Sequence, residues 1–128
     1  MVRQRIDLPG VVQAAPFSPA LVWQDLVFVS GQVGRDGKSG VAPADIAGQT
    51  RICLENVKAL VERAGASLDD ALKATIYMTD MAGEFAAMNE VFKTFFPGTP
   101  PARSTVGVAH LAKPDLRIEM DFIVACKR

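Results

Sequence analysis

The sequence has little of what metal-binding and nucleophilic enzymes need, with one histidine and two cysteines among its 128 residues. Because His110 is alone and no cysteines stand at ligand spacing, a zinc site of the Cys/His type is excluded. Cys53 and Cys126 form no CxxC pair, so we expect two reduced thiols and no disulfide. No GxSxG, Walker or GxGxxG motif occurs, and the sequence therefore contains no signal for a serine hydrolase or a nucleotide site.

The chain also lacks an excess of charge of either sign, because 14 Lys and Arg residues balance 14 Asp and Glu residues. Without a basic field we expect no nucleic-acid partner. Residues 1–7 contain no long apolar stretch, and no apolar run is long enough for a bilayer, so we expect no secretory signal and no membrane partner. The predicted location is the cytoplasm.

The composition is that of one globular domain, which we expect to span residues 1–128. Nearly half of the residues, 49%, are hydrophobic. Together with the neutral charge, this fraction favours burial of apolar surface against other chains.

Near the start, short apolar runs at 21–23 and 26–30 flank Gln24 and Asp25 and predict a β-hairpin.

Two helices are predicted from hydrophobic spacing and from capping residues. The first begins after Asp45, which can cap it, and continues to about Ala64, where Gly65 ends it. The second covers about 83–95 and is followed by a Pro-Gly pair. Residues 72–78, between the two helices, predict a strand.

The last third of the chain alternates between apolar and polar residues, which predicts half-buried antiparallel strands at about 102–109 and 116–124. The predicted order is β-β-α-β-α-β-β, an α+β fold with a mixed sheet and two helices packed on one face. Because the other face of such a sheet needs cover, we expect the chain to form oligomers, although composition does not give the number of subunits.

Polar residues on the last strands are the candidates for chemistry. Arg103 and Thr105 lie two residues apart on the polar side of their strand and share a sheet face. Glu119 also projects away from an apolar row. If the strands of Arg103 and Glu119 pair, the guanidinium can bind a substrate carboxylate and the carboxylate can position a water molecule. The alternative is a surface ion pair of little consequence.

Several segments match the RidA/YjgF family of reactive-intermediate deaminases in order and spacing, and together they cover nearly the whole chain. They are Ser30-Gly31-Gln32, Gln49-Thr50 with Asn56, residues 64–70 and 73–81, Asn89 before Phe95-Phe96, and residues 101–106 and 118–121. The resemblance implies a chorismate-mutase-like α+β fold. It also implies a homotrimer with clefts between adjacent subunits.

The activity that the resemblance implies is hydrolysis of 2-aminoacrylate-type enamines and 2-imino acids to 2-keto acids and ammonia, without a cofactor or metal. Arg103 corresponds to the residue that binds the substrate carboxylate. Glu119 corresponds to the residue that holds the attacking water. Ser30 and Asn89 match polar positions of the cleft, and Gly31 lies beside its floor.

Two positions depart from the family pattern, and both are expected to contact the substrate. Phe17 stands where the best-studied deaminases usually have tyrosine, and Thr105 where they often have cysteine. These departures leave open a specialised relative, such as a 2-aminomuconate-type deaminase that acts on a longer acid. A small-carboxylate-binding or regulatory trimer without turnover also stays open. A ribonuclease or translation inhibitor, the older label of the family, is disfavoured by the neutral charge.

Overall fold

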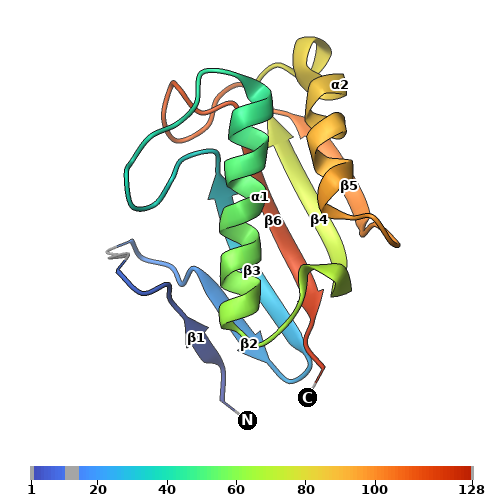
Figure 1. The fold of residues 1–128 in the computed structure, drawn as a ribbon. Coiled ribbons are helices and arrows are strands. Elements are labelled where there is room, and N and C mark those ends of the chain that lie inside the picture. The colour runs from blue at the N-terminus through green and yellow to red at the C-terminus, as the bar shows by residue number, and fades with distance from the viewer. Residues whose placement is uncertain (1, 11–14, 128) are drawn as a thin grey trace.

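A single mixed sheet of six strands organises the residues that the computed structural model describes, 2–10 and 15–127 (Figure 1). Its strand order is β1-β2-β3-β6-β4-β5. Strand β5 runs parallel to β4, and the other neighbouring strands are antiparallel. The strands are β1 (Gln4–Ile6), β2 (Ala20–Trp23), β3 (Leu26–Val33), β4 (Ala71–Met78), β5 (Ala102–Gly107) and β6 (Ile118–Ala125).

The predicted hairpin is confirmed as β2 and β3, which pair from Ala20 with Val29 to Trp23 with Leu26. Two residues therefore form the turn. The first of them, Gln24, has a positive φ of 54°. Positive φ values give a two-residue turn the twist that adjoining strands require.

Both predicted helices are present and both begin at a capping aspartate. Helix α1 (Ile46–Arg63) follows Asp45, whose carboxylate accepts a hydrogen bond from the Gly48 amide. Helix α2 (Met81–Phe92) begins two residues before its predicted start. The cause is Asp80, which caps the helix by accepting from the amide of Gly83.

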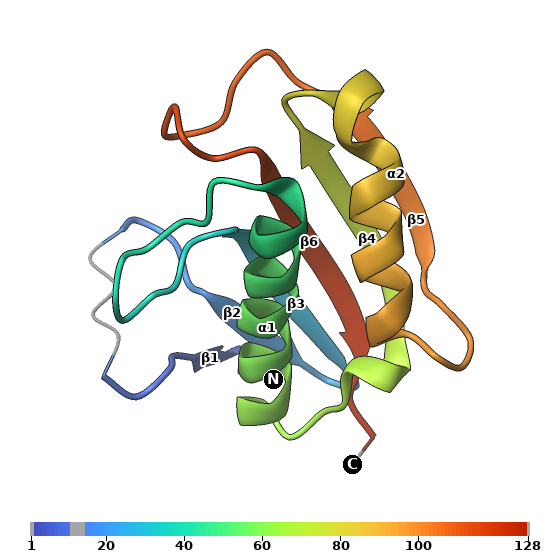
Figure 2. The ribbon, with the colours of Figure 1, turned by 45° about the horizontal axis from the view of Figure 1, so that its top comes forward.

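Helices α1 and α2 lie side by side on one face of the sheet, and Figure 2 shows that no helix of the described residues covers the other face. The core lies between these helices and the sheet. Its fully buried members include Leu54, Val57, Leu60, Ile76, Met78, Met88, Met120 and Phe122. On the uncovered face, aromatic and aliphatic side chains stay exposed, among them Trp23, Phe28 and Val106. None of the helices in the described ranges is both long and apolar enough to cross a membrane.

Three features of the sheet differ from the predicted order or were left open by it. The edge strand β1 precedes the predicted hairpin and has no counterpart in the predicted order. Strand β5 is parallel to its neighbour and not antiparallel, because α2 returns the chain to the end of the sheet where β4 began. Strand β4 lies between β5 and β6, so the strands of Arg103 and Glu119 do not pair.

Candidate active site

Arg103 leaves β5 on the side of the sheet that α2 covers. In the ladder with β4 it lies beside Ala74, which is buried beneath the helices. Its guanidinium carbon lies 4.9 Å from the centre of the Phe92 ring and 5.8 Å from the centre of the Phe85 ring. Thr105 lies two residues further along the same face. The shared face is confirmed, but it is the helix side of the sheet and not the outer side expected from the alternation.

Asn89 lies on the stripe of α2 that faces this arginine. Residues 85, 89 and 92 follow one another at steps of four and three, the spacing that aligns side chains along one side of a helix. Asn89 is half-buried and stands between the two rings in sequence. We call Arg103, Thr105, Asn89, Phe85 and Phe92 the arginine half-site.

The guanidinium of Arg103 carries a charge that nothing in the described part of the chain neutralises. No Asp or Glu side chain among these residues lies within ion-pair distance of it. Burial lowers the pKa of Arg103, although an arginine stays charged at any ordinary pH. A partly desolvated cation without an acidic partner is suited to bind an anionic group from outside the chain.

Glu119 leaves β6 on the opposite, helix-free face of the sheet. It lies beside Val33 of β3 and Tyr77 of β4. A Cβ atom added to Gly31 would lie 2.2 Å from Oε2 of Glu119 and 2.8 Å from its carboxyl carbon. The carboxylate therefore occupies the space that the missing side chain of Gly31 leaves, and the backbone there forms its floor.

We expect Gly31→Ala to remove most of the activity that depends on Glu119 while the protein stays folded. The new methyl group would push the carboxylate away, and because a glutamate side chain is flexible, the displacement costs little stability. Steady-state kinetics together with a thermal melt would measure both effects.

Gly34→Ala is the matched control, since a Cβ atom there would lie 2.4 Å from Cβ and 2.7 Å from Cα of Gln49 in α1. That contact involves helix backbone, so this variant should lower the melting temperature. If Gly31→Ala retains full activity, the placement of the carboxylate over Gly31 has no functional importance.

The environment of Glu119 favours its protonated form. Burial raises the pKa of this carboxyl group, and the nearby carboxylate of Asp121 raises it further. Asp121 lies on the same face, two residues along β6, and accepts a hydrogen bond of 2.9 Å from the hydroxyl of Tyr77. This hydrogen bond also raises the pKa of Tyr77. A raised pKa makes the ionised carboxylate a stronger base, so this group is suited to accept a proton and to return it.

Asp121→Asn should move the acid limb of the kcat/KM profile to lower pH. The ionised form of Glu119 is lost as pH falls through its pKa. Removing the neighbouring negative charge of Asp121 lowers that pKa, so the ionised form persists to lower pH. The amide oxygen of the new asparagine can still accept from Tyr77, so the local structure is kept. Asp25→Asn, in the exposed hairpin turn, controls for the change in net charge. An acid limb that stays in place or moves upward would show that Asp121 does not influence the base.

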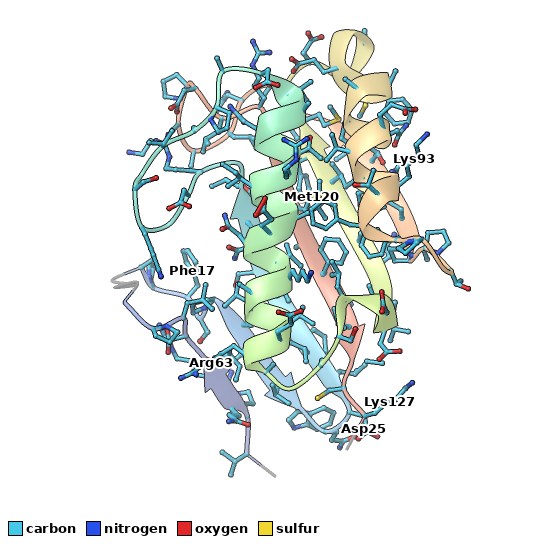
Figure 3. The ribbon with its side chains drawn as sticks, in the orientation of Figure 1. Phe17, Asp25, Arg63, Lys93, Met120 and Lys127 are labelled. Carbon is cyan, nitrogen blue, oxygen red and sulfur yellow. The ribbon has the colours of Figure 1, made fainter. Side chains whose placement is uncertain are left out.

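Ser30 holds the segment that precedes the hairpin. Its hydroxyl donates a hydrogen bond to the carbonyl of Ser18, and its amide donates to the carbonyl of Pro19 at 2.9 Å. The same segment carries Phe17, which is 50% exposed. Figure 3 places Phe17 at the opposite side of the molecule from Lys93 at the end of α2. We call Glu119, Gly31, Ser30 and Phe17 the glutamate half-site.

The two half-sites lie on different faces of one sheet and do not meet within a chain. Arg103 contacts rings of α2 on the helix side, whereas Glu119 lies on the helix-free side. The structure thus brings Arg103, Thr105 and Asn89 together and, separately, Glu119 with Gly31. It does not bring Arg103 to Glu119 within one chain, because β4 separates their strands and the condition of pairing is not met.

Gln49 positions the segment that precedes β6, a role that the sequence motifs did not reveal. Its amide nitrogen donates to the carbonyls of Pro43 at 2.9 Å and Asp115 at 2.8 Å, and its oxygen accepts from the amide of Arg117 at 2.8 Å. The fully buried side chain thereby fixes the segment that leads into β6 and Glu119. A polar residue on the apolar side of α1 was the available signal, because a buried amide must find partners.

Neither cysteine is placed for catalysis. Both are free and buried, which confirms the prediction of unpaired thiols. Burial raises the pKa of Cys53, and its thiol donates to the carbonyl of Gln32. Among residues 2–10 and 15–127, no cluster of His, Cys, Asp or Glu side chains is arranged to hold a metal ion.

The fold and the sequence together define the class of protein. The family described as Endoribonuclease L-PSP matches residues 10–126, nearly the whole chain. The chain belongs to this family, and the resemblance to RidA/YjgF proteins is thereby confirmed.

Curated relatives in the same family include proteins of Escherichia coli. The chain is 42% identical over 118 residues to a protein named "Putative reactive intermediate deaminase TdcF", covering 90% of this chain and 88% of that protein. It is 40% identical over 111 residues to "2-iminobutanoate/2-iminopropanoate deaminase", covering 84% of this chain and 85% of that protein.

Solved structures of such proteins share the fold. The E. coli TdcF structure with bound serine has a TM-score of 0.88 at 38% identity and covers 97% of this chain and 99% of that chain. The E. coli YjgF gene product has a TM-score of 0.90 at 34% identity, with the same coverage. RidA from an Antarctic Psychrobacter has a TM-score of 0.88 at 32% identity, covering 95% and 98%. The predicted α+β fold is confirmed.

Proposed function

We propose that the protein is an enzyme that hydrolyses 2-imino acids, and the enamines from which they form, to 2-keto acids and ammonia. The observation that carries the proposal is the guanidinium of Arg103, which lies partly buried on aromatic rings without an acidic partner among the described residues. An anion of the substrate is the partner that such a cation lacks. Both E. coli relatives are named deaminases, and the name of the second, "2-iminobutanoate/2-iminopropanoate deaminase", supplies the chemical class, a small acid with an imino group.

The reaction needs water, one carboxylate anchor and one proton-transfer group. An enamine first tautomerises to the imine, R–C(=NH)–COO⁻. Arg103 holds the carboxylate through two parallel hydrogen bonds and so fixes the orientation of the C=N carbon. Glu119 takes a proton from water as the oxygen bonds to that carbon and passes it to the imine nitrogen, which gives the carbinolamine R–C(OH)(NH₂)–COO⁻. It then takes the hydroxyl proton and passes it to nitrogen as the C=O bond forms and the C–N bond breaks. The products are R–CO–COO⁻ and NH₃, without change of oxidation state.

A complete site requires a second copy of the chain, because Arg103 and Glu119 leave opposite faces of one sheet. We therefore place the cleft between adjacent subunits of a homotrimer. The exposed apolar side chains of the helix-free face support this assembly, since Phe28, Trp23 and Val106 would be buried against a neighbour. An interface that joins the arginine half-site of one copy to the glutamate half-site of the next is heterologous, and three copies close such an interface into a ring when each is rotated by a third of a turn.

The remaining site residues take supporting roles in the proposal. Asn89 and Thr105 lie beside Arg103 and offer hydrogen bonds to the polar end of the substrate. Ser30 holds the segment of Phe17, and Gly31 makes room for the catalytic carboxylate. The Phe17 ring offers shape without a hydroxyl group, which favours an apolar substituent R. No organic cofactor or metal takes part in these steps, and the expected location is the cytoplasm.

The experiment is an ammonia-release assay in which an amino-acid oxidase forms 2-imino acids from a panel of amino acids. The protein should accelerate ammonia release above the rate of hydrolysis in buffer, and light scattering should give the mass of a trimer. Binding of 2-keto acids with no acceleration for any imine would support the carboxylate-binding alternative. A monomeric mass at micromolar concentration would contradict the shared cleft.

A further inference from the structure

The rings of Phe92 and Phe85 contact Arg103, and the proposed mechanism gives these rings no role. Phe92 is 5% exposed and lies closer to the guanidinium, at 4.9 Å, whereas Phe85 is 39% exposed and lies at 5.8 Å. Both distances are within the range of a cation–π attraction. Because these contacts are made with aromatic rings and not with a carboxylate, they leave the N–H groups of the guanidinium available, and those groups match a carboxylate in geometry.

Phe92 is itself held in place by further aromatic residues of the core. Its ring centre lies 4.8 Å from that of Phe96, which in turn lies 6.1 Å from that of Phe122 on β6. Phe96 and Phe122 are both buried. Close packing holds the Phe92 ring in position, so the surface beneath the guanidinium is formed before any ligand arrives.

These contacts replace the acidic partner that usually holds a buried arginine. A carboxylate of the chain would orient the guanidinium but would compete with the substrate anion for the same N–H groups. Aromatic faces attract the cation without occupying those donors. Burial against the rings also removes water, which strengthens the interaction with an arriving anion.

We infer that Phe92 and Phe85 are positioning residues that orient Arg103 for ligands with a planar carboxylate, an inference that rests on the role of Arg103 in the proposed function. They act through the arginine and do not take part in bond making. Their loss should therefore weaken the binding of a carboxylate more than the binding of an uncharged ligand of the same shape.

The test measures binding, so that it does not depend on turnover. Isothermal titration calorimetry would compare 2-oxobutanoate with its uncharged carboxamide on wild-type protein and on Phe85→Leu. Leucine keeps an apolar side chain but has no π face, and position 85 is exposed enough that folding should be unaffected. We expect carboxylate affinity to fall about fivefold or more, with the amide affected much less. Phe85→Tyr, which keeps the ring, should bind like wild type.

Phe92→Leu should have the larger effect, about tenfold, because its ring lies closer to the guanidinium. Since Phe92 is buried, a thermal melt must show that Phe92→Leu is folded. If Phe92→Leu is unfolded, the inference is tested by Phe85→Leu without it. Phe95→Leu, on the same segment but without a contact to Arg103, is the control and should bind normally.

Two results would overturn the inference. One is unchanged affinity of Phe85→Leu for the carboxylate, and the other is an equal loss for carboxylate and amide, which would mean that the ring touches the ligand directly. Failure of the proposed function gives a different result. In that case wild-type protein would bind 2-oxobutanoate in a manner dependent on Arg103 and on the rings, yet would release no ammonia from imines.

Discussion

Arg103→Ala should lower kcat/KM for carboxylate-bearing imines about a hundredfold, because a bidentate, partly desolvated contact with a carboxylate contributes roughly 3 kcal/mol. The protein should remain folded and oligomeric. Arg103 lies on an edge strand and is only partly buried, so its truncation opens space toward solvent and leaves no closed cavity. The measurement is steady-state deamination, with circular dichroism and light scattering on the same samples.

Three further variants make this prediction specific. Arg51→Ala, on the exposed side of α1, is the matched control and should keep wild-type activity. Arg103→Lys should restore little, since an ammonium group cannot reproduce the planar fork. Glu119→Gln should lose turnover while it still binds 2-keto acids, because an amide is not a base. Wild-type kcat/KM in Arg103→Ala would show that the assignment of the anchor is wrong.

Two inactive variants should restore activity when their subunits are mixed. If each site combines Arg103 of one subunit with Glu119 of the next, a mixed trimer of Arg103→Ala and Glu119→Gln chains contains some intact sites. Every trimer that contains both kinds of chain has both wild-type residues in one of its three sites, so the purified mixed trimers should show about a third of wild-type activity. Co-expression with two affinity tags, followed by tandem purification and the ammonia assay, would measure it.

The matched control mixes wild-type chains with chains that carry both substitutions. In mixed trimers purified in the same way, shared sites predict about a sixth of full activity, whereas sites contained within one chain predict about half. For the two single variants, sites within one chain predict no recovery at all. Recovery would therefore show that the cleft lies between subunits, and its absence in verified mixed oligomers would exclude a shared site.

Local structure could be predicted well because it depends on neighbours in the sequence. The capping role of Asp45, the two-residue turn at Gln24 and the end of α1 near Gly65 all follow from side chains and dihedral preferences within a few positions. The family and the α+β class were also predicted correctly, since motif order and hydrophobic periodicity extend along nearly the whole chain.

The position of each strand in the sheet could not be predicted from periodicity. Alternation shows which residues share a face but does not show which face the helices cover or which strand is the neighbour. For β5 the alternation suggested that the apolar residues face the helices. In the structure Ala102 and Val106 are exposed on the helix-free face, whereas Arg103 lies on the side that α2 covers. Helix α2, inserted between β4 and β5, decided both the parallel direction and the edge position.

The sequence by itself determined the elements, the family and the residue types available for chemistry, an arginine and a glutamate on strands. Only the tertiary structure decided that Arg103 and Glu119 leave opposite faces of the sheet. It also decided that two aromatic rings, and no acidic residue among those described, contact the guanidinium. The reason is that side-chain periodicity is a local property, whereas the packing of a helix on a sheet joins residues distant in the chain.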